Sequence, residues 1–261
     1  MLITHLFWFH CFKIDRIIPM VKDANETISI AIETSSRYGG IALGRNDSLV
    51  ATADFDANRR QAVQLVSRLA ELLGENGLRP GDVDEVYISI GPGSFTGLRI
   101  GITVAKTLIQ AVEFIRPEPK LRCVTVPSTE VVAENFSSGR LKTEYLGVVM
   151  DAGKQELYSA IYRKAASGEL IASSPARVLK EANFLTEIPR PITLTGEALA
   201  YHQISAQGIT IAPKELWYPN AQCLWKVARR MTLKGNFCQY NMIRPIYIRK
   251  TSVLFRKRAG R

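Results

Sequence analysis

The sequence predicts an α/β chain with two lobes. Three alternating, β-branched segments come first, followed by a helix, a short buried strand, a glycine-rich turn and a second helix, and a partial repeat of this order follows. The first strands are joined by short turns, so they are predicted to form an antiparallel meander. A regular array of parallel β–α–β units does not fit this order.

Composition narrows the class of protein. A chain of 261 residues can bury a large core without disulfides, and 46% hydrophobic with 22% charged residues exclude a disordered or low-complexity chain. The net charge of +10 suggests an anionic partner such as nucleic acid. No apolar run approaches the ~18 residues of a membrane span, so we expect no membrane association.

The four cysteines form no C-x-x-C pair and have no zinc-site spacing with histidine. We therefore expect reduced thiols in a cytoplasmic protein.

Residues 1–27 differ from the rest and are set aside as a leader. Residues 1–19 are rich in aromatic and apolar side chains, but no basic residue precedes the apolar stretch as in a signal peptide. We expect that the start was assigned too early and that Met20 or a nearby residue begins the protein. The alternative is an interaction tail.

The first lobe is predicted to span 28–126. Its helix at 98–112 has apolar residues on one face, and the strand before it runs into a glycine loop at 91–97. In chain order we predict strands at 27–35, 39–44 and 49–55, a helix at 59–74, a strand at 86–90, the helix at 98–112 and a strand at 123–126.

The second lobe is predicted to span 127–249, with a basic tail at 250–261. Ser128 is predicted to cap a helix that begins near Thr129. The remaining elements are a hairpin at 145–150 and 156–162, a strand at 192–196, an amphipathic helix at 221–234 and an extended segment at 245–249.

The segment GPGSFTGLRIG at 91–101 is the most informative stretch. It follows a strand and opens a helix, which makes it a candidate anion site. It is not a Walker A loop, because Leu98 and Arg99 follow Gly97, and Thr96 replaces the third glycine of a dinucleotide fingerprint. The alternative is that the glycines only allow close helix packing, with Ser94 or Thr96 as the cap.

Several segments resemble the TsaB (YeaZ) family in wording and order. They are ETSSRYGGIAL at 33–43, GPGSFTGLRIG at 91–101, DAGKQELYSAIY at 151–162, TGEAL at 195–199 and RPIYIRK at 244–250. The resemblance implies an ASKHA (actin/hexokinase-like, ribonuclease H-like) fold with two related lobes. It also implies a role in threonylcarbamoyladenosine synthesis on tRNA, in a family often labelled glycoprotease-like or peptidase M22-like.

The resemblance also implies partners. TsaB-like proteins usually serve as the non-catalytic partner of a related catalytic subunit, TsaD, in a complex that includes the ATPase TsaE. A homodimer is the alternative pairing, and tRNA is reached through the complex. We expect no cofactor on this chain alone, with ATP and Mg²⁺ at the level of the complex.

Histidines decide whether this chain resembles the enzyme or its partner. The catalytic relative holds a metal through an H-x-x-x-H helix, but the matching region at 105–139 contains no histidine. The chain has only His5, His10 and His202, so we expect no metal site. The rival functions are an ATP-dependent ASKHA phosphotransferase or ATPase and, more weakly, a metallopeptidase.

Carboxylates and the glycine loop define a candidate nucleotide cleft. Glu33 and Asp151 end comparable strands of the two lobes, and Mg²⁺ needs only one or two carboxylates beside phosphate oxygens. The alternative is that both acids only stabilise turns. The predicted cleft comprises Glu33, Thr34, Ser35, Gly91, Gly93, Ser94 and Asp151.

The helix at 59–74 has a wider apolar surface than one core contact requires. It is either enclosed in its own fold or packs on another subunit, and the resemblance supports the second reading. Gln61 stands where the family commonly has histidine. The predicted interface comprises Ala62, Val63, Val66, Ala70, Leu73, Arg99, Thr103 and Lys106.

The chain ends in a run of basic residues without an acid. Such a run could contact tRNA phosphates, or it could be a solvated terminus. The candidate contacts are Arg249, Lys250, Arg256, Lys257 and Arg258.

Overall fold

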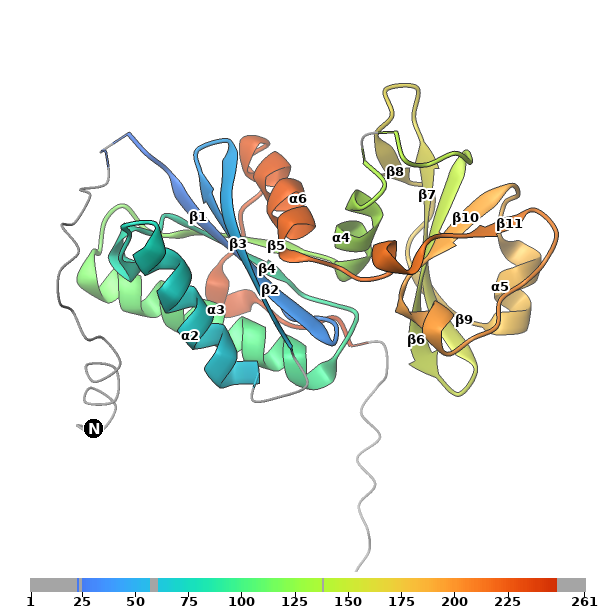
Figure 1. The fold of residues 1–261 in the computed structure, drawn as a ribbon, viewed down its shortest axis with the longest axis horizontal. Coiled ribbons are helices and arrows are strands. Elements are labelled where there is room, and N and C mark those ends of the chain that lie inside the picture. The colour runs from blue at the N-terminus through green and yellow to red at the C-terminus, as the bar shows by residue number, and fades with distance from the viewer. Residues whose placement is uncertain (1–22, 24, 57–60, 138, 248–261) are drawn as a thin grey trace, which may run out of the picture.

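A computed structural model of the chain describes residues 23, 25–56, 61–137 and 139–247. Most of the predicted leader and the whole basic tail lie outside these residues. Two sheets stand next to each other, and helices cover each of them (Figure 1). Within the described ranges, no helix has the length and apolar character needed to cross a membrane.

The first sheet has five strands in the order β3-β2-β1-β4-β5. Strands β1, β2 and β3 form the predicted antiparallel meander, whereas β4 runs parallel to β1 and β5 runs parallel to β4. The strands are β1 (Ile28–Glu33), β2 (Tyr38–Arg45), β3 (Ser48–Asp56), β4 (Glu85–Ser89) and β5 (Arg122–Val126).

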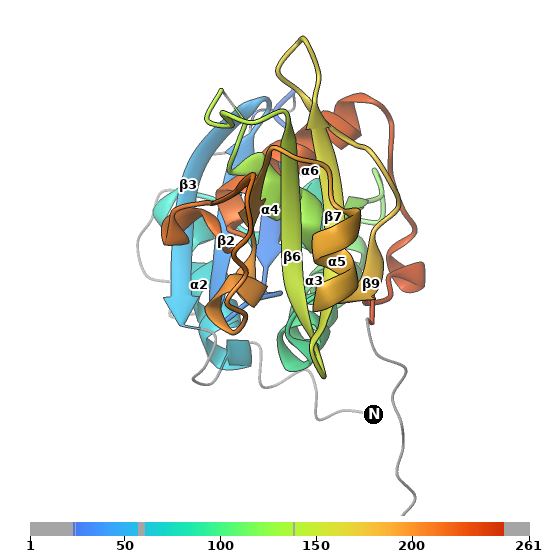
Figure 2. The same ribbon diagram turned by 90° about the vertical axis from the view of Figure 1, so that its right-hand side faces the viewer.

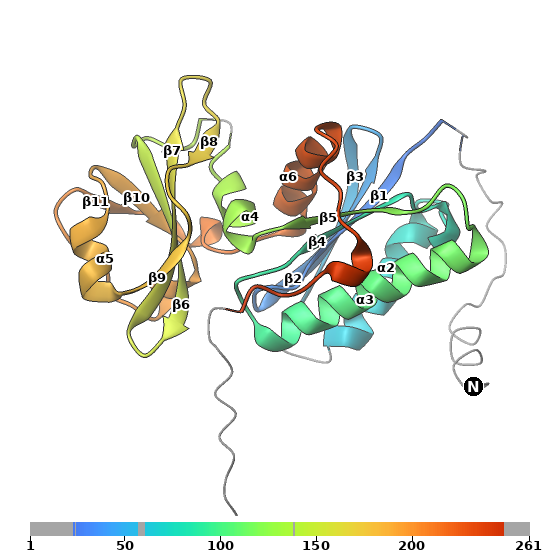
Figure 3. The ribbon, with the colours of Figure 1, turned by 180° about the vertical axis from the view of Figure 1, so that it is seen from behind.

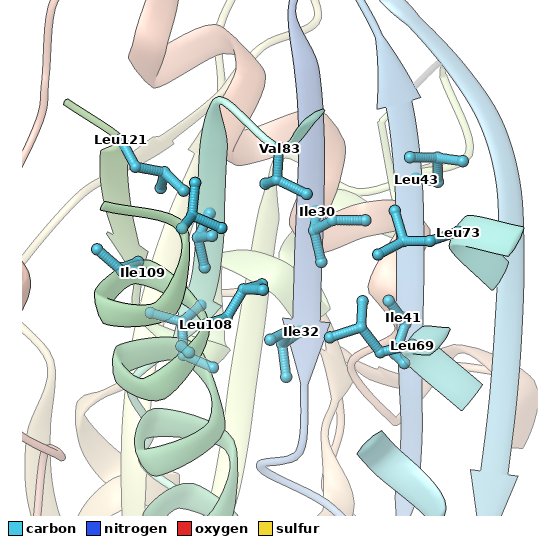
Figure 4. Packing of buried hydrophobic residues seen from close by; sticks show 14 of the residues in the cluster. Ile30, Ile32, Ile41, Leu43, Leu69, Leu73, Val83, Leu108, Ile109 and Leu121 are labelled. Atoms are coloured by element: carbon cyan, nitrogen blue, oxygen red, sulfur yellow. The ribbon is translucent and has the colours of Figure 1, made fainter. Parts of the chain in front are cut away.

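Alternation along β1 explains why both faces of this sheet are buried. Ile28, Ile30 and Ile32 point to one face, and Ala31 points to the other. Helices α2 (Gln61–Glu75) and α3 (Phe95–Ile115) cover the isoleucine face, and Figure 4 shows their leucines packed on the strands. A short 3-10 turn, η1 (Pro80–Asp82), lies between α2 and β4.

The opposite face of the first sheet is covered by α6 (Ala221–Leu233), near the end of the chain. Its Trp225 ring nitrogen donates to Ser29 Oγ at 2.8 Å, and Leu224 is fully buried against the sheet. The structure therefore divides the chain differently from the predicted second lobe of 127–249. The apolar side of α6 is buried on the first sheet, so this segment belongs to the first lobe (Figure 3).

The second sheet repeats the strand order of the first. It runs β11-β10-β6-β7-β8, with β9 also pairing with β7. As in the first sheet, an antiparallel hairpin (β6 and β7) is extended on its other side by two parallel strands. The strands are β6 (Tyr145–Gly153), β7 (Glu156–Lys164), β8 (Leu170–Ala172), β9 (Arg177–Lys180), β10 (Ile192–Thr195) and β11 (Ile209–Ile211).

Two short helices cover the second sheet. Residues of α4 (Ser128–Glu134) pack on one face and residues of α5 (Glu181–Glu187) on the other, and Figure 2 shows α5 in front of the sheet. Three 3-10 turns complete the chain: η2 (Glu197–Ala200), η3 (Lys214–Leu216) and η4 (Tyr240–Met242).

Two predicted helix starts differ from the structure. Helix α3 begins at Phe95 because Ser94 Oγ accepts the Gly97 amide at 3.2 Å, which confirms Ser94 as its cap. Ser128, in contrast, is wrong as a cap. Pro127 holds the cap position of α4, and Ser128 is the first helical residue.

Candidate functional site

The glycine loop closes against the end of β1. A Cβ on Gly93, whose φ is +156°, would stand 2.1 Å from the carbonyl oxygen of Ser35. The Ser94 amide donates to that same oxygen at 2.7 Å, and the Ser128 amide donates to Gly91 O at 2.8 Å. The loop therefore bonds to the chain's own turns, which supports the packing interpretation of the glycines.

Glu33 is sealed beneath this loop. The residue is 0% exposed, and its Oε1 accepts the Ser35 amide at 2.7 Å. Its Oε2 makes no well-formed hydrogen bond in the described structure. Burial raises the pKa of Glu33, and hydrogen bonds from Ser35 and Ser89 offset only part of this effect. The strand end thus holds a fully buried carboxyl group whose pKa is raised.

The first lobe does not fit a nucleotide phosphate at the predicted position. Glu33, Thr34 and Ser35 are each 0% exposed, and the Ser94 amide that a phosphate would need is already bonded to Ser35. Asp151 lies in the second lobe, where its Oδ1 accepts the Gly153 amide at 2.8 Å. The predicted cleft residues therefore do not form a single open site.

The second lobe instead contains an acid cluster that the sequence analysis did not predict. His202 Nδ1 lies 2.7 Å from Glu181 Oε2, and His202 Nε2 lies 3.3 Å from Asp151 Oδ1. Burial lowers the pKa of His202, but hydrogen bonds with these two carboxylates outweigh it and raise the pKa overall. We call Asp151, Glu181, Glu197 and His202 the carboxylate–histidine cluster.

Glu197 is the strongly perturbed acid of this cluster. Burial and the charge of Asp151 raise the pKa of Glu197 to about 7, and Arg37 acts in the opposite direction. Arg37 comes from the first lobe, between β1 and β2. Its Nη2 donates to Tyr218 Oη at 2.6 Å, and its guanidinium carbon lies 5.2 Å from the centroid of the Tyr38 ring. The cluster thus responds to a charge from the other lobe.

A hollow also opens between the lobes, away from the predicted cleft. A cavity of about 630 Å³ is bounded by α4, α6 and the hairpin of β7 and β8. Arg230 and Glu134 form a bidentate ion pair at its wall, at 2.5 and 3.0 Å. In the ranges that the structure describes, no group of three or more His, Cys, Asp and Glu side chains is arranged to hold a metal ion.

The exposed side of α2 carries part of the predicted interface. Val63 is 63% exposed and Val66 is 45% exposed, and Ala62 is exposed beside them. Ala70 is half-buried. Leu73 is only 1% exposed and is wrong as an interface residue: it lies one helical turn from buried Leu69 and packs on β2 (Figure 4).

Helix α3 contributes the neighbouring surface. Arg99 and Thr103 are exposed, and the Arg99 guanidinium carbon lies 3.8 Å from the Phe95 ring centroid. Lys106 is half-buried, and its Nζ donates to Ile243 O at 3.1 Å, so it fixes the chain's own C-terminal segment. Figures 1 and 3 show α2 and α3 side by side on the same side of the first sheet.

We call the exposed part of these two helices the helix face. It comprises Ala62, Val63, Val66, Phe95, Arg99 and Thr103. The candidate tRNA contacts Arg249, Lys250, Arg256, Lys257 and Arg258 lie outside the described residues.

Comparison with known proteins places the chain in a family. The family model "TsaD: tRNA N6-adenosine threonylcarbamoyltransferase" matches residues 55–220. The TsaB protein of Bacillus subtilis is 27% identical over 67% of this chain and 72% of its own length. The TsaB protein of Escherichia coli is 25% identical over 89% of this chain and 98% of its own length. The chain belongs to the TsaB (YeaZ) family.

A solved structure of this family shows the same fold. YeaZ from Pseudomonas aeruginosa superimposes with a TM-score of 0.70 at 21% identity, covering 85% of this chain and 99% of that chain. The predicted α/β fold with two related lobes is confirmed. A tRNA N6-adenosine threonylcarbamoyltransferase from Anaeromyxobacter is 28% identical over 52% of this chain, but only 36% of that relative is covered.

The carboxylate–histidine cluster was missed because its residues are not periodic in sequence. Asp151 lies near the end of β6, and Glu197 follows β10, so only the parallel pairing of these strands brings both to one edge. The segments DAG and TGEAL each carried one of the acids. The sequence around His202 gives no signal of the two carboxylates, because they come from other segments of the chain.

Proposed function

We propose that this chain is a non-catalytic scaffold subunit in the synthesis of threonylcarbamoyladenosine. The modified adenosine lies beside the anticodon of tRNAs that read codons starting with A. The chain acts by docking a TsaD-like catalytic subunit through the helix face. Membership of the TsaB family supports the pathway, and relatives named as TsaB biosynthesis proteins carry this function in their names.

The single observation that carries the docking role is the surface of α2. Val63 and Val66 are exposed on α2, whereas the leucines of this helix are buried in the first lobe. Adjacent exposed apolar side chains on a rigid helix are typical of a protein–protein contact. On α3, Phe95 is also 44% exposed, and its ring centroid lies 5.4 Å from that of Tyr247.

The sealed first lobe supports a non-catalytic role. An ATP-dependent phosphotransferase of this fold would need phosphate access at the end of β1, where Glu33 is 0% exposed. We propose that ATP and Mg²⁺ act at the level of the complex, which also includes a TsaE-like ATPase, and that tRNA is reached through the complex in the cytoplasm. Self-association through the helix face is the competing use of the same surface.

The double substitution Val63→Glu with Val66→Glu tests the docking role. Two charges on the helix face should abolish co-elution with the organism's TsaD in size-exclusion chromatography, because desolvating them is costly. Modification of tRNA in a reconstituted assay should fall at least about tenfold, which corresponds to 1.4 kcal/mol.

Ile171→Glu is the matched control, because Ile171 is 56% exposed on β8 of the second sheet, whereas α2 and α3 cover the first sheet. This variant should co-elute normally. Unchanged co-elution of the helix-face variant would contradict the docking site. ATP turnover by the pure protein that is lost in Glu33→Ala would favour the enzyme alternative.

A further inference from the structure

The chain returns to the first lobe through a C-terminal strap, residues 236–247. After α6 the strap crosses the edge of β5 and then runs along α3 (Figure 3). The Cys238 amide donates to Cys123 O at 2.8 Å, and the Ile246 amide donates to Ile90 O at 2.7 Å. Between these points Ile243 is buried in the core cluster of α2 and α3. The strap therefore covers one edge of the first sheet.

Two cysteines face each other where the strap begins. Cys123 on β5 and Cys238 on the strap are directly opposite in an antiparallel β-bridge. Opposite residues in such a pair have Cα atoms about 4.5 to 5.5 Å apart, and disulfides require about 4.4 to 6.8 Å. Both thiols are free, and Cys123 is buried whereas Cys238 is half-buried. Backbone pairing thus holds the two thiols within bonding range.

The two thiols differ in acidity. The hydrogen bond from Cys123 lowers the pKa of Cys238 to about 7, and the same contact raises the pKa of Cys123. Cys238 is therefore the more acidic and the more accessible of the two thiols. Cys223 differs from both, because burial raises its pKa to about 11 and its Sγ donates to Asn135 Oδ1 at 3.2 Å.

We propose that Cys123 and Cys238 form a redox-sensitive dithiol, which a hydroperoxide converts to a disulfide that fixes the strap to β5. The Cys238 thiolate attacks one peroxide oxygen; an S–O bond forms, the O–O bond breaks, and the other oxygen leaves with a proton as water or an alcohol. The Cys123 thiol then attacks the sulfenic sulfur. An S–S bond forms, and the hydroxyl leaves as water with the Cys123 proton.

The electrons balance across these two steps. The two thiols lose two electrons and two protons in total, and the peroxide accepts both. Ionised Cys238 acts as the attacking thiolate and Cys123 as the resolving thiol, so the buried position of Cys123 is no obstacle once Cys238 has reacted. The inference does not depend on the proposed docking function, because it uses only the strap and β5.

The test treats the reduced full-length chain, carrying Cys11→Ser, with hydrogen peroxide, and maps disulfides by mass spectrometry without reduction. We expect one linked peptide pair, Cys123 with Cys238. Because the thiolate reacts, its formation should be about tenfold faster at pH 8 than at pH 6. Cys123→Ser and Cys238→Ser should each abolish the link. Cys223→Ala should form it normally and is the matched control.

Hydrogen exchange measures whether the link fixes the strap. Amides of 236–247 should exchange more slowly in the oxidised chain than in the reduced chain, and Cys238→Ser should show no difference after peroxide. Links to Cys223 in comparable yield, or oxidation of Cys238 to sulfinic acid without a link, would overturn the dithiol. A link that leaves strap exchange unchanged would overturn the clamping role.

Discussion

The two lobes share one sheet topology but use the same strand end in different ways. In each sheet a hairpin is extended on one side by two parallel strands, in the same order. In each, a glycine after the first parallel strand abuts the backbone of the central strand or the turn that follows it. A Cβ on Gly93 would stand 2.1 Å from Ser35 O, and one on Gly196 would stand 2.0 Å from Val149 O.

The acids at these two strand ends have opposite environments. Glu33 is 0% exposed under the glycine loop, whereas the Asp151 side chain is 38% exposed and reaches His202. The first lobe is closed by α3 and by the strap, whose Ile246 bonds to Ile90 next to the loop. Topology is therefore repeated while the chemistry of the strand end is not.

This difference shows which features of the repeated topology depend on backbone packing and which depend on the side chain at the strand end. The backbone contacts that need glycine persist in both lobes because the fold depends on them. The acid of the first lobe is a buried group, whereas the acid of the second lobe is part of a polar cluster. Residues at equivalent places in a repeated fold thus carry structural information even where they carry no shared function.

The largest expected loss of stability comes from substitutions that disrupt the close glycine–backbone contact found in both lobes. Gly93→Ala and Gly196→Ala should each lower the free energy of unfolding by about 3 kcal/mol, because the new methyl group meets a carbonyl oxygen that cannot move and Gly196 has a φ of +118°. Urea unfolding at pH 7 measures both variants.

Gly74→Ala is the control for these substitutions. Gly74 lies inside α2 with nothing within 4 Å of its would-be Cβ, so alanine there should be neutral or stabilising by up to about 1 kcal/mol. If one of the two loop variants lost less than about 1 kcal/mol, the proposed equivalence of the lobes would fail.

A pH-dependent effect separates the two lobes further. The pKa of Glu197 is raised to about 7 in the folded chain, so its stabilising contribution is complete below its ordinary value and is lost as pH rises through about 7. Glu197→Gln removes this loss and should be more stable than the parent chain at pH 8 by about 2 kcal/mol, with the advantage shrinking by pH 5.

Urea unfolding at several pH values checks this prediction. Glu33→Gln should act in the same direction, because burial raises the pKa of Glu33 as well. Glu71→Gln, in a surface pair with Arg68, is the control and should change stability by less than about 0.5 kcal/mol at either pH. A Glu197→Gln advantage that does not depend on pH would refute the assignment of the proton to this acid.

Many secondary-structure elements could be predicted because short sequence patterns, such as alternating apolar residues and glycine turns, determine them. Isoleucines at every second position predicted β1, and the glycine loop predicted a helix after it, although that helix, α3, begins at Phe95 and not at Leu98. The return of α6 to the first lobe could not be predicted, because an amphipathic helix shows that it packs but not on which sheet. Trp225 reaches Ser29 across 196 residues of sequence, a distance at which pattern carries no information.

The candidate site was less predictable than the fold for a related reason. The wide apolar surface of α2 predicts that some apolar side chains, such as Val63 and Val66, stay exposed. The burial of Leu73 depends on the rotation of the helix about its axis relative to β2, which the sequence does not give. The cleft prediction assumed that equivalent acids stay open to solvent. In the structure Glu33 is fully buried, and the glycine loop bonds to Ser35 beside it, a tertiary contact between segments distant in sequence.

The smallest expected effect comes from Arg37, the first-lobe residue whose positive charge lowers the pKa of Glu197. Arg37 is exposed and held by the rings of Tyr38 and Tyr218, so Arg37→Ala should change stability at pH 5 by no more than about 0.5 kcal/mol. Because Arg37 lowers the pKa of Glu197, its loss should move the midpoint of the Glu197-dependent stability change upward, by less than about one pH unit.

Arg37→Lys separates charge from ring contact in this experiment. Lysine keeps the positive charge but lacks the planar group that donates to Tyr218 Oη, so the midpoint should stay near that of the parent chain. For each Arg37 background, the free energy of unfolding of the Glu197→Gln variant is subtracted from that of the chain with Glu197 at every pH. The midpoint is the pH at which this difference has changed by half. A midpoint that moves equally in both Arg37 variants would show that the tyrosine contact, and not the charge, couples the two lobes.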